Sequence, residues 1–153
     1  MTGGITGGMI DHQELCTLIP HAGSMCLLDA VESWDAQQIV CLAVSHRDPA
    51  NPLRSEGGLK AIHGIEYAAQ AMAVHGGLCA RARGEHSSGG FLAALRDVVL
   101  HVPRLDQLAA PLRVAASEQM RAGGSFIYDF SVSDADGQAL LSGRATVMAQ
   151  EEG

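Results

Sequence analysis

The sequence has few basic residues for its length. Lys and Arg number 10 among 153 residues, against 17 Asp and Glu, and the formal net charge is −7. A nucleic-acid-binding domain usually carries a basic patch, and no segment of this chain supplies one. The composition therefore predicts no nucleic-acid partner. An acidic protein partner would need a few arginines on the surface to which it binds.

Long apolar runs are also missing. No stretch approaches the roughly 20 residues that a helix needs to cross a bilayer, so no membrane span is expected. The N-terminal sequence MTGGITGGMID has neither the basic start nor the apolar core of a signal peptide. We therefore expect a cytoplasmic protein, with a flexible lead-in over residues 1–10 and a single domain over residues 11–150.

The sequence contains no C-x-x-C pair and no H-x-x-x-H pair. Its four cysteines, each with apolar neighbours, are Cys16, Cys26, Cys41 and Cys79. This pattern favours core thiols over disulfides or a zinc site. The seven histidines are scattered, so no metal and no other cofactor is expected.

Residues 59–82, LKAIHGIEYAAQAMAVHGGLCARA, form a long stretch rich in alanine and free of proline. Its composition favours a helix. On a helical projection, one narrow arc holds four polar residues: His63, Glu66, Tyr67 and Gln70. Apolar residues such as Ala69 cover most of the remainder, which predicts a buried helix with one polar line. Glu66 then needs a partner, because an unpaired buried carboxylate is costly.

The flanking sequence predicts an antiparallel sheet. Asp11 can cap a short helix through about Leu18, and a loop over residues 19–25 holds His21. Strands are expected at 25–34, 38–46, 91–102, 111–121, 125–134 and 138–150. Residues 125–134 alternate strictly, with one face made of Phe126, Tyr128, Phe130 and Val132. Asp136-Gly137 is a hairpin turn, and Gly143 is a candidate bulge. A hairpin, one helix and a meander predict an α+β domain in which the sheet wraps the helix, and its free edges favour a dimer.

Two segments, IPHAGSMCLLDAV (19–31) and GIEYAAQAMAVHGGL (64–78), resemble motifs of the 3-hydroxyacyl-[acyl-carrier-protein] dehydratases. The second is similar to the E-A-M-A-Q helix motif of the fatty-acid dehydratases. The chain looks most like the small dehydratase-like proteins of aryl polyene gene clusters, and the likeness extends through GFLAALRDVVL (90–100). The resemblance implies a hotdog fold. It also implies dehydration of 3-hydroxyacyl thioesters to trans-2-enoyl thioesters in fatty-acid, polyketide or aryl polyene assembly.

The resemblance has one departure. Fatty-acid dehydratases carry a catalytic histidine in a loop just before the helix, and the corresponding NPLRSEGGLKA (51–61) has none. Glu66 corresponds to the motif glutamate, and the histidine must come from elsewhere. His21, on a separate loop, is the first candidate and His63 the second.

The expected chemistry needs a base at C2, an acid at the departing C3 hydroxyl and a donor to the thioester oxygen. A histidine suits the base and Glu66 the acid. Backbone N–H groups at the helix start are the expected donors, from Gly57, Gly58 or Leu59. Gln70 is grouped with the substrate-binding residues, and a structural hydrogen bond is its alternative role.

Two other functions fit the same residues. One is thioester hydrolysis, with Glu66 activating water. The other is a non-catalytic hotdog subunit that binds acyl thioesters or completes a heterodimer. The acyl group would arrive on the phosphopantetheine of an acyl carrier protein or on coenzyme A, and Arg47, Arg54 and Arg96 are candidate contacts for an acidic carrier. A homodimer is the first expectation for assembly.

Overall fold

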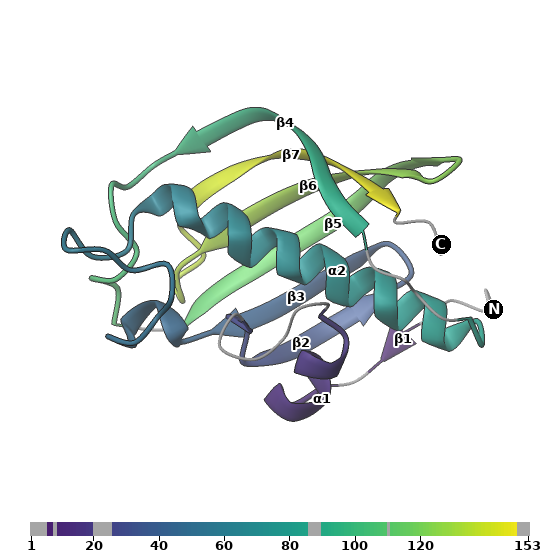
Figure 1. Cartoon of the computed structure of the whole chain (residues 1–153), viewed down its shortest axis with the longest axis horizontal. Coiled ribbons are helices and arrows are strands. Elements are labelled where there is room, and N and C mark those ends of the chain that lie inside the picture. Colours follow the sequence, from purple (N-terminus) through teal and green to yellow (C-terminus); the bar gives the residue numbers. More distant parts are fainter. Residues whose placement is uncertain (1–5, 8, 20–25, 86–89, 110, 150–153) are drawn as a thin grey trace.

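The computed structural model describes residues 6–7, 9–19, 26–85, 90–109 and 111–149. Along the chain, a short strand and a short helix precede a hairpin, the long helix and four more strands (Figure 1). His21 lies outside the described residues, so its role as a base stays a prediction.

The described strands form one antiparallel sheet in the order β1-β2-β3-β5-β6-β7-β4. Their bounds are β1 Thr6–Gly7, β2 Ala30–Asp35, β3 Gln38–Ala43, β4 Gly90–Leu100, β5 Leu112–Ala122, β6 Ser125–Ser133 and β7 Ala139–Ala149. Strand β4 follows the long helix in the chain but pairs with β7, so β1 and β4 are the two edges.

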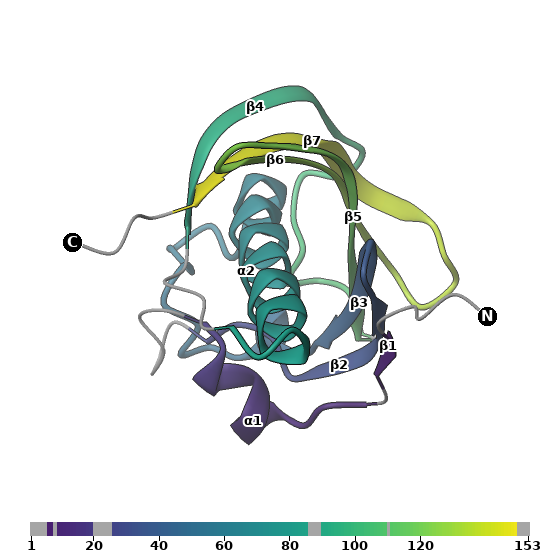
Figure 2. The same ribbon diagram turned by 90° about the vertical axis from the view of Figure 1, so that its right-hand side faces the viewer.

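The sheet curves around α2 (Gly64–Ala82), which leaves one side of this helix without strands (Figure 2). A 3-10 turn, η2 (Ala61–His63), leads into α2, and another, η1 (Ser45–Arg47), follows β3. The short α1 (His12–Thr17) is capped by Asp11, whose carboxylate accepts from the Glu14 N–H, as the sequence predicts. The α+β prediction of one helix wrapped by a curved sheet is confirmed.

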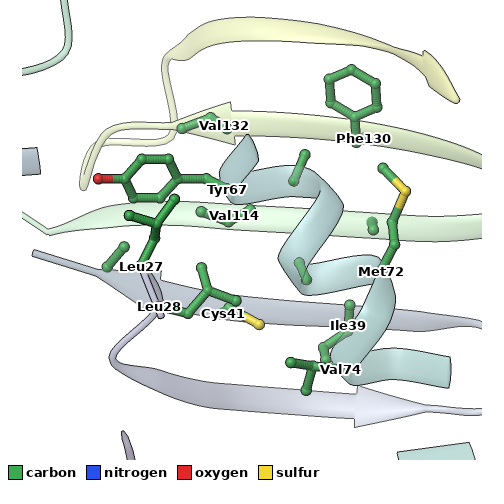
Figure 3. Packing of buried hydrophobic residues seen from close by; sticks show 14 of the residues in the cluster. Leu27, Leu28, Ile39, Cys41, Tyr67, Met72, Val74, Val114, Phe130 and Val132 are labelled. Atoms are coloured by element: carbon green, nitrogen blue, oxygen red, sulfur yellow. The ribbon is translucent and has the colours of Figure 1, made fainter. Parts of the chain in front are cut away.

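The core lies between the concave face of the sheet and α2 (Figure 3). Its buried side chains include Ile39, Cys41, Tyr67, Met72, Val74, Val114, Phe130 and Val132. In β6 the predicted alternation places Tyr128, Phe130 and Val132 on the buried face. The predicted turn at Asp136-Gly137 also forms, because Gly137 adopts a φ of 88° that other residues avoid.

The long helix begins later than predicted. The Leu59 N–H donates to Asp106 Oδ1 at 2.9 Å, and its carbonyl accepts from the Leu105 N–H at 2.8 Å. Lys60 forms a β-bridge with Arg104. These bonds hold residues 59–60 extended, so the regular α-helix starts only at Gly64.

The bulge expected at Gly143 lies on the neighbouring strand: between the Arg96–Arg144 and Val99–Ser142 pairs, two β4 residues face the single residue Gly143, which is itself not the bulged residue. Gly143 pairs in register with Phe130. A Cβ at this position would lie 2.8 Å from the Phe130 ring atom Cζ. The glycine therefore gives the ring room against the β7 backbone.

The prediction of four core thiols is wrong for two of them. Cys16 and Cys26 form a disulfide, with their Cα atoms 5.9 Å apart. The predicted strand 25–34 begins only at Ala30, which leaves Cys26 in a connecting segment beside α1. Cys41 and Cys79 are buried free thiols, as predicted, and burial raises the pKa of Cys41 to about 12.

Part of the predicted flexible lead-in is ordered. Thr6 and Gly7 pair with Asp35 and Trp34 in the sheet. Ile10 is buried and exchanges two backbone hydrogen bonds with Val31. This segment therefore extends the sheet at its β2 edge.

Candidate functional site

The face of α2 turned away from the sheet carries a half-covered stripe of residues. Glu66 is exposed on it, as is Ile62 in the preceding turn η2, while Ala69 and Ala73 are half-buried. These positions are three or four residues apart, so they lie in one row along the helix. Ala69 was expected on the buried side and lies instead in the same row as Glu66. We call Ile62, Glu66, Ala69 and Ala73 the open stripe.

Glu66 has no hydrogen bond or ion pair with any residue in the described part of the chain. His63, one turn earlier, is half-buried, and no hydrogen bond joins the two side chains within the described part. Within the described part of the chain, His63 is therefore not the partner that a buried Glu66 was expected to need. The reason is that α2 turns Glu66 outward, away from the concave side of the sheet.

Tyr67 and Gln70 take the opposite direction. The Tyr67 hydroxyl lies 2.8 Å from Ser45 Oγ and accepts a hydrogen bond from Asn51 Nδ2 at 2.9 Å. Gln70 Oε1 accepts a hydrogen bond from the Leu27 N–H at 2.8 Å. Burial raises the pKa of the Tyr67 phenol. The predicted polar line therefore divides, with Glu66 outside and Tyr67 and Gln70 holding the connecting segments to the helix. The hydrogen bond from the Leu27 N–H supports the structural role that was the alternative to substrate binding for Gln70.

The turn before α2 leaves one of the three expected backbone donors unused. The Gly58 N–H donates to the Ser55 carbonyl at 2.9 Å, and the Leu59 N–H donates to Asp106. These two amides are engaged within the fold, which argues against their role as donors to a thioester. Gly57 is exposed, and no hydrogen bond from its amide is found within the described part of the chain.

Strand β4 is an apolar edge. Its side chains Phe91, Leu95, Val99 and Leu100 are 55%, 40%, 46% and 45% exposed. On its other side β4 pairs with β7, so its outer backbone groups have no strand partner in the described part of the chain. Figure 1 shows α2 in front of the sheet, and β4 lies at the margin of this open side. An exposed apolar sheet edge is a surface for pairing with a second chain.

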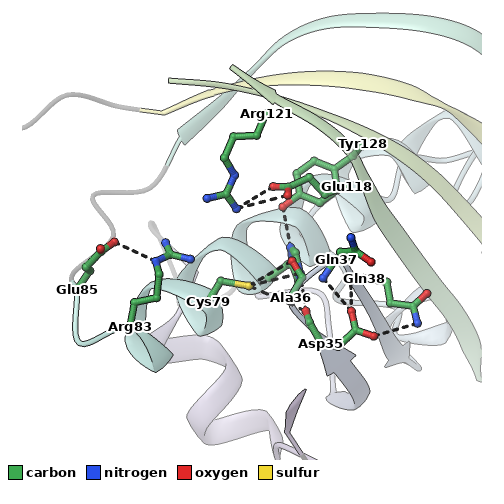
Figure 4. Close-up of polar contacts among 11 residues, drawn as sticks. Asp35, Ala36, Gln37, Gln38, Cys79, Arg83, Glu85, Glu118, Arg121 and Tyr128 are labelled. Carbon is green, nitrogen blue, oxygen red and sulfur yellow. Dashed lines mark hydrogen bonds and ion pairs between the residues drawn. The ribbon is translucent and has the colours of Figure 1, made fainter. Parts of the chain in front are cut away.

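A second polar group lies inside the C-terminal half of α2 and was not predicted from the sequence. His75 is buried, with Nε2 2.9 Å from the Asp35 carbonyl oxygen and Nδ1 2.7 Å from the Tyr128 hydroxyl. Figure 4 shows Tyr128, Glu118 and Arg121 above Asp35 and Cys79. A histidine within a long apolar helix is the signal that marks this position in the sequence.

The protonation of His75 follows from its two contacts. A backbone carbonyl can only accept, so Nε2 carries the hydrogen. Burial lowers the pKa of His75, so the ring is neutral and Nδ1 accepts from the Tyr128 O–H. The pKa of Tyr128 is raised, chiefly by burial, which keeps its proton in place. This group therefore links α2 to β2 and β6 as a structural unit.

The distribution of cations is uneven. Six arginines form ion pairs with carboxylates: Arg81, Arg83, Arg104, Arg113, Arg121 and Arg144. The other four cations have no ion pair within the described chain: Arg47, Arg54, Lys60 and Arg96. Three of these four lie between β3 and α2. None of the described helices is long and apolar enough to cross a membrane.

The single long helix wrapped by a curved antiparallel sheet defines a hotdog fold. The family model of the ApeP dehydratases, ApeP-like, matches residues 13–152, so the chain belongs to the ApeP-like dehydratase family.

Solved structures share the fold of this chain. A chain of the dehydratase heterocomplex ApeI:P from Xenorhabdus doucetiae is 25% identical, with a TM-score of 0.81 over 90% of this chain and 91% of that one. Two thioesterases share the fold. PA1618 from Pseudomonas aeruginosa, solved as a mutant, is 14% identical, with a TM-score of 0.64 over 92% of this chain and 96% of that one. HI1161 from Haemophilus influenzae is 11% identical, with a TM-score of 0.66 over 93% and 92%. A search of curated proteins found no match.

Proposed function

We propose that this chain is one subunit of a dimeric dehydratase, and that its active site forms on the open stripe when a second hotdog subunit pairs with β4. The observation that carries the proposal is the outward placement of Glu66 in one row with the half-buried Ala69 and Ala73 of the same helix. A catalytic acid works best in a site from which water is excluded. The described part of the chain does not cover Glu66, so the partner has to supply that cover.

The reaction removes water without any change in oxidation state. A histidine takes the C2 proton, and the electron pair forms the C2–C3 double bond as the C3–O bond breaks. Glu66 donates a proton to the departing hydroxyl, which leaves as water. We place His21 first and His63 second as the base, because His21 comes from a separate segment of chain and His63 is on the same side as Glu66.

The partner is a second hotdog subunit of a different sequence. The similar Xenorhabdus chain comes from a heterocomplex, which supports this choice over a homodimer. The absence of a histidine from residues 51–61 also supports it, because a different partner can supply what this chain lacks. Two apolar edges of the β4 type can join by continuing one antiparallel sheet across both chains.

An acyl carrier protein is the proposed donor of the substrate. Arg47, Arg54 and Lys60 have no ion pair within the described chain and lie in the segment that leads to α2. An otherwise acidic surface with local unpaired cations suits a small acidic carrier that docks near the start of this helix. Coenzyme A thioesters are the comparison substrate.

The test is an assay on a 3-hydroxyacyl carrier protein by intact-mass spectrometry. It uses the chain alone and the complex that co-purifies with it from its own cells. We expect the complex to produce the enoyl species by loss of one water. Glu66→Gln should lower the rate by about a hundredfold or more, the scale of a general acid. Glu85→Gln, an exposed carboxylate beyond the end of α2, should not change it. Free acid as the product would identify a thioesterase, and an unaffected Glu66→Gln complex would refute the proposed mechanism.

A further inference from the structure

A cluster of soft ligand atoms lies on α1, away from the open stripe. His12 and Cys16 are one helical turn apart, and Cys26 reaches the same place from the segment before β2. A ligand atom of each residue lies within 4.8 Å of those of the other two. The sequence predicted no metal because it lacks an H-x-x-x-H pair. His12 and Cys16 form the corresponding H-x-x-x-C spacing, which also places two ligands on one helix face.

The imidazole of His12 is oriented by the backbone. Its Nδ1 lies 3.0 Å from the Leu28 carbonyl oxygen. Since a carbonyl can only accept, Nδ1 carries the hydrogen and Nε2 keeps its lone pair. That Nε2 lies 3.5 Å from Cys16 Sγ. A histidine whose second ring nitrogen donates to a carbonyl is the usual arrangement of a metal ligand.

We propose that His12, Cys16 and Cys26 bind one Zn²⁺ when the Cys16–Cys26 disulfide is reduced. Bond lengths of about 2.3 Å to sulfur and 2.0 Å to nitrogen place tetrahedral ligand atoms about 3.5–3.8 Å apart. The His12–Cys16 contact already has this spacing. The ligand atom of Cys26 lies within 4.8 Å of the other two. Two thiolates and an imidazole select zinc over magnesium or calcium.

The neighbouring carboxylates are already engaged. Asp11 accepts the N-cap bond of α1, and Glu14 pairs with Arg81 of α2 at 2.7 Å. Water is therefore the fourth ligand, which gives the donor set of three protein ligands and one open position. The disulfide and the metal exclude each other, because the sulfur–sulfur bond removes the thiolates that the metal requires.

The position of the cluster gives it a consequence for the fold. Residues 17–25 connect the two cysteines, and His21 is among them in the sequence. Disulfide and zinc each join the two ends of this segment. The metal therefore replaces the covalent cross-link under reducing conditions. This inference does not depend on the proposed dehydratase activity, because its measurements are of metal binding.

The experiment reduces the full chain, removes the reductant under anaerobic conditions and titrates it with Co²⁺ and then Zn²⁺. We expect one Co²⁺ per chain, with the charge-transfer band of thiolate ligands and the visible bands of tetrahedral cobalt, and displacement of the cobalt by Zn²⁺. Binding should release protons and weaken as the pH falls, because the thiols must lose theirs. Unreduced protein should give no thiolate band. After denaturation it should have two fewer titratable thiols than the reduced protein.

Matched variants locate the site. Cys16→Ser and Cys26→Ser should each remove the charge-transfer band or reduce its intensity to that of one thiolate. His12→Ala should weaken zinc binding at least tenfold, and circular dichroism should establish that the variant is folded. His101→Ala, an exposed imidazole elsewhere, should bind as the parent does. The proposal is overturned if the reduced parent binds no metal, or if His12→Ala binds zinc as tightly as the parent.

Discussion

Single residues divide between positions that the described part of the chain leaves uncovered and positions that are complete within it. Glu66 belongs to the first kind, since it faces outward without a contact from the described residues. His75 belongs to the second, since both of its ring nitrogens are hydrogen-bonded inside the fold. The two residues lie on the same helix, yet Glu66 is exposed and His75 is buried.

The choice of base can be tested at the level of single side chains. In the assay of the complex, we expect His21→Ala to lower the dehydration rate by about a hundredfold or more, the scale of a lost general base. His63→Ala should have a smaller effect, because His63 shares the side of the substrate that Glu66 occupies. If His63→Ala is inactive and His21→Ala is not, the fold assignment stands and the order of the two bases is reversed.

His75 predicts a loss of stability at mildly acidic pH. Burial lowers its pKa in the folded chain below the ordinary value of 6.5. Below that value the unfolded chain takes up a proton that the folded chain does not, so the free energy of unfolding falls as the pH decreases. Urea unfolding at about pH 7.5 and about pH 5.5, on either side of the ordinary histidine pKa, measures the difference.

The matching variant is His75→Gln. Glutamine can donate to the Asp35 carbonyl but does not titrate, so the variant should lose part of the pH dependence between those two conditions. An identical pH dependence in the parent and in His75→Gln would show that other groups cause it.

At the scale of elements, the sequence pattern of α2 predicts the helix itself but not the direction in which each polar side chain points. The pattern predicted a long helix and its polar positions, because periodicity follows from the geometry of the helix alone. It did not predict that Glu66 faces outward while Tyr67 and Gln70 face the fold. That division depends on the hydrogen bonds of Gln70 and Tyr67 with Leu27, Ser45 and Asn51, which lie in other segments of the chain. A local sequence pattern does not predict such tertiary contacts.

The same difference between local patterns and tertiary contacts is found elsewhere in the chain. The alternation in β6 and the Asp136-Gly137 turn were predicted, because each depends on neighbouring residues. The disulfide and the late start of α2 were missed. Both depend on tertiary contacts, namely Cys26 returning to α1 and the Leu59 N–H binding Asp106.

A substitution in the open stripe of α2 tests whether a partner covers this helix surface. Ala69→Glu should leave the fold of the single chain intact, because Ala69 is only half-buried there. It should weaken the complex, because a partner that covers the stripe would enclose an unpaired carboxylate. Thermal unfolding of the chain alone and co-purification of the partner measure the two effects.

Ala82→Glu, at the exposed end of the same helix, is the control and should change neither property. Unfolding of the Ala69→Glu chain itself would mean that this face is part of the core. Undiminished partner binding would mean that the partner lies elsewhere.

At the scale of the whole molecule, β4 should change most when the partner binds. We expect slow hydrogen exchange at the outward amides of β4 in the complex and fast exchange in the chain alone, because strand pairing protects amides. Amides of β6, which is paired on both sides, should be protected in both states. Light scattering gives the stoichiometry. A stable complex with fast exchange throughout β4 would exclude this edge as the interface.

The apolar edge also has a consequence for how the protein is produced. A chain made without its partner exposes Phe91, Leu95, Val99 and Leu100 along an unpaired strand, which favours self-association and aggregation. A cell that makes this subunit in excess would lose the surplus to chaperones and proteases. If the proposed partner covers this edge, recombinant yield should rise more from co-expression with that partner than from stronger expression of this chain alone.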